Sequence, residues 1–192
     1  MWLVEYGRAS AFAQLVRFLV DVLTGVPSIM FGLFVYIVLI VGTGSTYAGY
    51  KGSVALGLLM LPIVIRSSEV VLQLVPGELR ESALALGSPR WRMIARVVLP
   101  TALPGMVTGI LLAVARAAGE TAPLLFTAGA TLRTDFGPGE FMNSLPTQIY
   151  YDILSPTASV YERAWGAGLT LVAMVLLLNL VARVISRRSR LA

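Results

Sequence analysis

The stretch VPGELRESALALGSPRWRMIARVVLP, residues 75–100, is a polar interruption between two long apolar runs. The residues in it that favour helix ends predict two short helices. Pro76 can open the first helix, and Gly87 can end it as a left-handed C-cap. Ser88 can cap the second helix, with Pro89 at its first position. Two short helices joined by a tight turn indicate a loop outside the membrane.

The sequence on either side of this loop is apolar enough to cross a membrane. A spanning helix needs about 20 mostly apolar residues. The chain has 192 residues, of which 57% are hydrophobic and 13% are charged, whereas soluble domains carry roughly 25% charged residues. We therefore predict an all-α integral membrane protein of one domain, 1–192. Its four expected spans are 26–42, 52–75, a run that starts at Thr101, and 164–182.

The basic residues predict an orientation. With four spans, the N-terminal segment, residues 66–99 and the C-terminal tail share one side, and they hold 11 of the 15 lysines and arginines. Cytoplasmic loops carry such an excess, so we expect both termini to be cytoplasmic. The net charge of +5 is then a topology signal, and we expect no binding to nucleic acid.

The composition also limits the catalytic and metal-binding functions that the chain can have. The chain contains no Cys and no His, which excludes disulfides, thiol catalysis and the usual zinc ligand sets. We expect no metal site and no cofactor. The apolar runs hold no evident pairing of a nucleophile with a base, so an enzyme is not favoured.

Residues 1–25 are expected to form an amphipathic helix on the cytoplasmic side. Its apolar positions follow helical spacing and are Phe12, Leu15, Val16, Leu19, Val20 and Leu23. Arg17 and Asp21 lie elsewhere on its surface. We expect this helix to pack against the other helices rather than to lie on the membrane.

Two charges interrupt the third apolar run, in VARAAGETAPLLF, residues 114–126. Arg116 and Glu120 are four residues apart, so on a helix they share a face and can pair. Gly119 and Pro123 weaken the helix there, so it is expected to kink or end. Charges in a membrane are costly and usually functional.

Two interpretations of this pair stay open. It can be a salt bridge that fixes helix packing. Alternatively, it can line an anion path, with Arg116 attracting the anion and Glu120 tuning or releasing it. An arginine suits an oxyanion because its planar guanidinium can donate two hydrogen bonds.

The loop carries a more specific signal. Its residues fit the pattern E-A-A-x3-G-x9-I-x-L-P at Glu81, Ala83, Gly87, Val97, Leu99 and Pro100. Ser82 and Val97 are mild departures from it. This pattern resembles the cytoplasmic signature of ABC importer permeases. The resemblance implies a MetI-like helical bundle whose loop, 76–99, docks on a cytoplasmic ATPase through Glu81, Ser82, Ala83 and Gly87.

The resemblance implies a transport subunit rather than an enzyme. The sequence contains no nucleotide-binding loop of the form G-x4-G-K-[ST], so ATP hydrolysis is expected on a separate chain.

Four segments together narrow the resemblance. GVPSIMFGLF at 25–34, LPIVIRSSE at 61–69, the loop pattern and ARAAGETAPLLF at 115–126 occur in this order. The set is similar to the permease subunits of phosphate-specific ABC importers, the PstA/PstC type, and most similar to the PstA branch. The resemblance implicates Arg116 and Glu120 in phosphate passage.

The same resemblance implies partners and a location. The partners are a PstC-type permease, two copies of a PstB-type ATPase, a PstS-type phosphate-binding protein and membrane lipid. The location is a bacterial or archaeal inner membrane. The family usually has six spans, so we expect its first two to be missing from this chain, which leaves the termini cytoplasmic.

Alternatives remain open at this point. The chain can be a permease for sulfate or molybdate, or a secondary transporter or channel that uses the Arg116–Glu120 pair as a relay. It can also be an incomplete, non-transporting membrane subunit. The loop 129–163, with a net charge of −2, can contact a binding protein or act only as a spacer.

Overall fold

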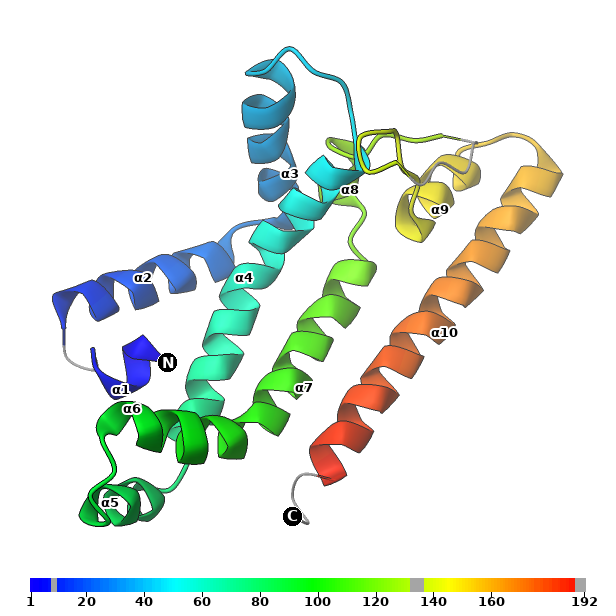
Figure 1. Ribbon diagram of the computed structural model, residues 1–192. Coiled ribbons are helices and arrows are strands. Elements are labelled where there is room, and N and C mark those ends of the chain that lie inside the picture. The colour runs from blue at the N-terminus through cyan, green and yellow to red at the C-terminus, as the bar shows by residue number, and fades with distance from the viewer. Residues whose placement is uncertain (8–9, 132–136, 189–192) are drawn as a thin grey trace. The chain divides into compact units, whose positions relative to one another are not determined.

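The computed structural model describes residues 1–7, 10–131 and 137–188, with side chains described as far as 184. The regular structure of these residues is helical, from α1 (Trp2–Glu5) to α10 (Ala158–Arg188) (Figure 1). Several charges counted in the sequence lie outside the described residues or side chains: Arg8, Arg133, Asp135, Arg187, Arg188 and Arg190.

Three helices in the described part of the chain are long and apolar enough to cross a membrane. The first is α4 (Gly49–Gln73). The second runs without a break over 90–118 through α6 (Arg90–Met93), the π-helical segment η2 (Ile94–Val98) and α7 (Leu99–Ala118). The third is α10, over Ala158–Val184. These confirm the spans expected at 52–75, from 101 and at 164–182.

The span expected at 26–42 belongs to a bent pair of helices, which passes for a fourth span only as a pair. This stretch forms α3 (Ser28–Tyr36) and the π-helical segment η1 (Ile37–Val41), which together are too short for one span. Only together with α2 (Ala11–Gly25) are α3 and η1 long enough for a span, and a break separates α2 from them. Pro27 is the N-cap residue of α3, and the residue before a proline is disfavoured in helical conformation. The helix therefore breaks here.

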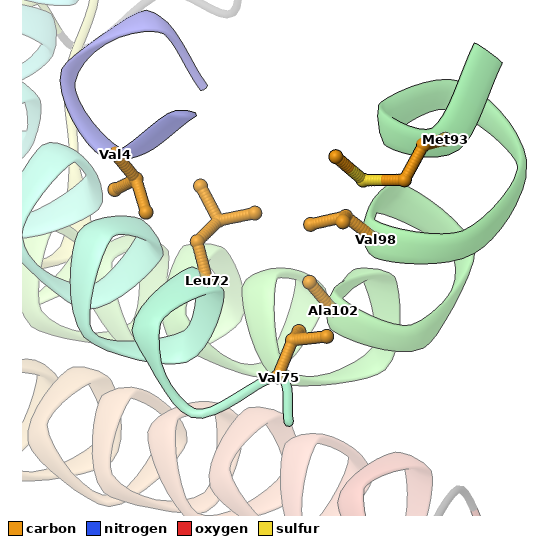
Figure 2. Close-up of a cluster of buried hydrophobic side chains, with 6 residues drawn as sticks. All are labelled: Val4, Leu72, Val75, Met93, Val98 and Ala102. Carbon is orange, nitrogen blue, oxygen red and sulfur yellow. The ribbon is translucent and has the colours of Figure 1, made fainter. Parts of the chain in front are cut away.

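The described residues belong to two compact units. One contains residues 1–25, 62–113 and the chain from 180 onward; the other contains 26–61 and 114–179. The core of the first unit is a cluster of buried side chains (Figure 2): Val4, Leu72, Val75, Met93, Val98 and Ala102. This cluster joins α1, the C-terminal end of α4 with Val75 just after it, and the continuous helix over 90–118.

Two glycines let α7 approach α4 closely in this unit. A β-carbon on Gly105 would lie 2.7 Å from Val71 Cγ1, and one on Gly109 would lie 2.5 Å from Ser67 Oγ. The spacing Gly-x3-Gly places both glycines on one face of α7, a pattern that membrane helices use for close packing. The sequence analysis did not single out this contact.

The helix expected over 1–25 is divided into α1 and α2. Ala13 and Val20 of α2 are buried, and Arg17 Nε lies 2.6 Å from Glu69 Oε1 on α4. Asp21 lies 3.8 Å from Arg66 of the same helix, so two ion pairs join α2 to α4. Phe12, by contrast, is 62% exposed. Apolar side chains need no protein partner in a bilayer, because lipid tails are as apolar as they are.

The polar loop folds into α5 (Gly77–Ala85), a turn and α6. The turn confirms the left-handed glycine: Gly87 has a φ of +75°. The amide of Ser88 donates to Ala83 O, and that of Gly87 donates to Leu84 O, the pair of bonds that defines a Schellman C-cap. Ser88 was wrongly expected to cap the second helix, because α6 has Pro89 as its N-cap and no side-chain cap.

The second unit is built around α8 (Ala122–Leu125). A β-carbon on Gly32 of α3 would lie 2.7 Å from Pro123 Cα, so the two backbones touch. On another side, Gly52 approaches Leu124 and Ala128. The loop over 129–163, called the outer loop below, contains the short helix α9 (Leu145–Ile153), which begins with a capping box between Ser144 and Thr147.

Candidate functional site: a charged helix break and a polar loop

The third apolar run breaks where the sequence predicted. The helix α7 ends at Ala118, and residues 119–121 are not helical. The amides of Gly119 and Glu120 donate to Arg116 O and Ala117 O, which tightens the last turn. Pro123 has no N–H to continue a helical ladder, so the chain restarts as α8. We call residues 116–121 the charged break.

The two charges of this break lie close together but are not tightly bonded. Arg116 Nε lies 3.8 Å from Glu120 Oε1, too far for a hydrogen bond. Glu120 lies beyond the end of α7, so the pair does not share one helix as expected. The Arg116 side chain is 65% exposed, and the Glu120 side chain is 18% exposed. Arg116 thus keeps a guanidinium that can receive an anion.

The chain after the break is held firmly. Pro123 and Thr127 are almost fully buried, and Thr127 Oγ1 donates to Pro123 O at 2.8 Å. The amide of Ala48 donates to Thr127 O at 3.0 Å. Together with the contact of Gly32 on Pro123, these bonds fix the segment that follows Glu120. The charged break therefore connects the exposed Arg116 to a segment that these contacts hold in place.

The polar loop presents its predicted docking residues on one short helix and the turn after it. Glu81, Ser82 and Gly87 are exposed, and Ala83 packs against the core cluster of the first unit. Glu81 also lines a cavity of about 320 Å³ together with Glu5 and Arg80. An exposed polar helix with a left-handed glycine at its end is a suitable contact surface for another protein.

Charged contacts in the first unit were missed by the sequence analysis. Arg80 Nη2 lies 3.0 Å from Glu5 Oε1. Glu69 is buried, and its carboxylate oxygens lie 2.6 Å from Arg17 Nε and 3.4 Å from Arg66 Nη1. The Arg80–Glu5 and Arg17–Glu69 partners lie 75 and 52 residues apart in the sequence, so no local pattern indicates them. Arg66 and Glu69, by contrast, are only three residues apart.

The outer loop contains a further ion pair. Arg163 of α10 donates to both carboxylate oxygens of Asp152, at 2.8 and 2.7 Å, and Gln148 Nε2 donates to one of them at 2.9 Å. The hydrogen bond from Arg163 holds the pKa of Asp152 below its ordinary value, and burial opposes this effect. The pair ties α9 to the second turn of α10.

Comparison with known proteins places the chain in a family. Residues 2–191 match the family described as the binding-protein-dependent transport system inner membrane component. This chain belongs to that family. Its likeness to individual members is strong: the chain is 46% identical over 193 residues to a protein of Yersinia pestis named phosphate transport system permease protein PstA. It is 46% identical over 182 residues to a protein of the same name from Mycobacterium leprae.

The chain covers only part of these relatives. It spans 64% of the Yersinia pestis protein and 59% of the Mycobacterium leprae protein, while they match 99% and 94% of this chain.

A solved structure confirms the fold predicted from the loop pattern. The inward-facing MetNI methionine ABC transporter contains a chain that superposes with a TM-score of 0.75, at 21% identity. The match covers 97% of this chain and 82% of that one. The fold is therefore that of an all-helical ABC importer permease.

Proposed function

We propose that this chain is a permease subunit of an ATP-driven phosphate importer and forms half of the translocation path. The observation that carries the proposal is the charged break, where Arg116 presents an exposed guanidinium 3.8 Å from Glu120. The names of the relatives support phosphate as the substrate.

The chemistry of the break suits a transported oxyanion. Among the described residues, the Arg116 guanidinium donates no hydrogen bond, so two N–H groups at its edge can donate to two oxygens of phosphate. Glu120 offsets the arginine's charge. A site for transport must bind weakly enough to release its substrate, and a neighbouring carboxylate serves this purpose. Arg116 attracts the anion, and Glu120 limits how long it stays.

Transport needs further subunits. A PstC-type permease completes the path, two copies of a PstB-type ATPase supply the energy, and a PstS-type protein delivers phosphate from outside. The ATPase docks on α5 and its turn through Glu81, Ser82, Ala83 and Gly87. In this arrangement the loop lies in the cytoplasm, both termini are cytoplasmic, and the complex resides in a bacterial or archaeal inner membrane. The chain itself hydrolyses no ATP.

The test is uptake of radiolabelled phosphate by cells that lack their own high-affinity importer. The chain is expressed with its neighbouring genes, and membrane levels are checked by immunoblot. We expect uptake that disappears when the partner ATPase is inactivated and that persists when the proton gradient is dissipated.

Competition identifies the substrate in the same assay. A hundredfold excess of unlabelled phosphate should abolish uptake of label, whereas the same excess of sulfate or molybdate should leave it unchanged. Competition by sulfate or molybdate instead of phosphate would contradict phosphate as the substrate. Loss of uptake with the proton gradient alone would contradict an ATP-driven importer.

A further inference from the structure

Arg80 occupies an unusual place in the first unit. It belongs to α5, the helix that carries the proposed docking residues, yet its side chain turns away from that surface and is only 17% exposed. The neighbouring Glu81 is exposed and available to a partner protein. Arg80 is thus mostly buried, whereas Glu81 beside it is exposed.

The Arg80 guanidinium binds the end of α4. Nη1 donates to Val75 O at 2.6 Å, and Nη2 donates to Leu72 O at 2.8 Å. The last carbonyls of a helix have no partner within it, and a cation at this end is favoured by the helix dipole. Leu72 and Val75 are themselves members of the buried core cluster (Figure 2). Arg80 therefore ties α5 to the C-terminal end of α4 and to the buried residue that follows it.

Glu5 holds this guanidinium in place. Its carboxylate lies 3.0 Å from Nη2 of Arg80 and is only 8% exposed. Its neighbour Val4 packs in the core cluster. Arg80 Nε is buried and has no acceptor among the described residues, so loss of Glu5 would leave a poorly compensated charge in this site.

We propose that Arg80 is the positioning residue that makes α5 and α4 move as one body, with Glu5 as the residue that orients it. The inference rests on the proposed function, because it assumes that α5 receives the motion of a partner ATPase. Arg80 does not bind the ATPase. It passes the displacement of α5 to α4 through the Leu72 carbonyl of that helix and the Val75 carbonyl just after it.

Spin labels can test this directly in the assembled complex in lipid nanodiscs. The chain has no native Cys, so labels can be placed at Leu79→Cys on α5 and Val70→Cys on α4, both exposed and in the same unit. Distances are measured without nucleotide and with ATP trapped on the partner. We expect one unchanged distance in both states for the otherwise wild-type chain, and a shifted or broadened distribution for Arg80→Gln with ATP.

Three variants complete the design. Glu5→Gln keeps the carbonyl bonds and should broaden the distribution less than Arg80→Gln does. Arg92→Gln is the matched control, because Arg92 is exposed on the same loop and lies over the Trp91 ring; it should behave as wild type. Phosphate uptake by Arg80→Gln should fall at least about tenfold, because the charge-assisted hydrogen bonds of the guanidinium to Leu72 O, Val75 O and Glu5 are lost, while Arg80→Lys restores part of it.

The outcomes separate the two proposals. Identical distance distributions in Arg80→Gln and wild type, in both nucleotide states, would overturn the role of Arg80. Failure of Arg80→Gln alone to co-purify the ATPase would also overturn it, because Arg80 would then be a direct docking contact. The distances need no substrate, so a wild-type complex that takes up no phosphate would refute the proposed substrate and leave this test readable.

Discussion

Two arginine–glutamate pairs in this chain differ in how firmly they are held. Arg80 lies 3.0 Å from Glu5, is 17% exposed and donates to two backbone carbonyls. Arg116 lies 3.8 Å from Glu120, is 65% exposed and donates to no group among the described residues. A guanidinium with most of its donors used holds the protein's own backbone. A guanidinium with its donors free is available to a ligand.

The largest difference is expected in stability. Glu5→Gln removes the charge that compensates a mostly buried arginine, which costs about 2–3 kcal/mol and lowers the melting temperature by about 5–10 °C. Glu120→Gln should shift it by no more than about 2 °C, because its partner stays solvated. Tryptophan fluorescence of the purified chain in detergent measures both. Equal shifts for the two variants would remove the distinction between the pairs.

The next prediction concerns the contact between Gly32 and Pro123, which holds the segment after Glu120 in place. Gly32→Ala places a β-carbon 2.7 Å from the Pro123 backbone and should cost about 1–3 kcal/mol through overpacking. Gly25→Ala is the matched control, because a β-carbon there meets no atom within 4 Å. Chemical unfolding of both variants compares them. If Gly32→Ala is as stable as Gly25→Ala, the segment after Glu120 is not held by this contact.

A smaller effect is expected in the turn of the polar loop. Gly87 has a φ of +75°, and a residue with a β-carbon is strained there by about 1–2 kcal/mol. Gly87→Val should therefore weaken co-purification of the ATPase, whereas Gly77→Ala at the start of α5, with open space around it, should not. Normal yield of the ATPase with Gly87→Val would contradict the docking assignment.

The smallest effect concerns a third pair, Asp152 with Arg163. Arg163 lowers the pKa of Asp152, so the pair stabilises the fold at pH values above the ordinary carboxyl range. This contribution is lost as the pH falls through the lowered pKa. The melting temperature of wild type should exceed that of Asp152→Asn at pH 6, and the gap should shrink below about pH 4. A gap that does not change with pH would show that the charge of Asp152 is not involved.

Local patterns in the sequence were sufficient for several of these features. The apolar runs predicted the three long spans, Gly87 predicted the left-handed turn, and Gly119 with Pro123 predicted the charged break. Each depends on residues within a few positions of one another, where propensity and backbone sterics act directly.

Contacts between distant residues could not be predicted in this way. The Arg80–Glu5 pair joins residues 75 positions apart, and nothing near either residue indicates its partner. The contacts of α2 with α4 could not be predicted either, because a helical pattern of apolar residues does not indicate the partners of the charges between them. Charges in a bilayer are usually paired, and Arg17 pairs with Glu69, 52 residues away.

The most direct test of the account is the initial rate of phosphate uptake by Arg116→Gln at a membrane level equal to wild type. The control is Arg183→Gln, which removes an exposed arginine from α10. The account predicts that Arg116→Gln loses at least about tenfold in rate, that Arg116→Lys keeps part of it, and that Arg183→Gln transports as wild type does. Uptake by Arg116→Gln at the wild-type rate would contradict this prediction, because it would show that Arg116 does not bind the substrate.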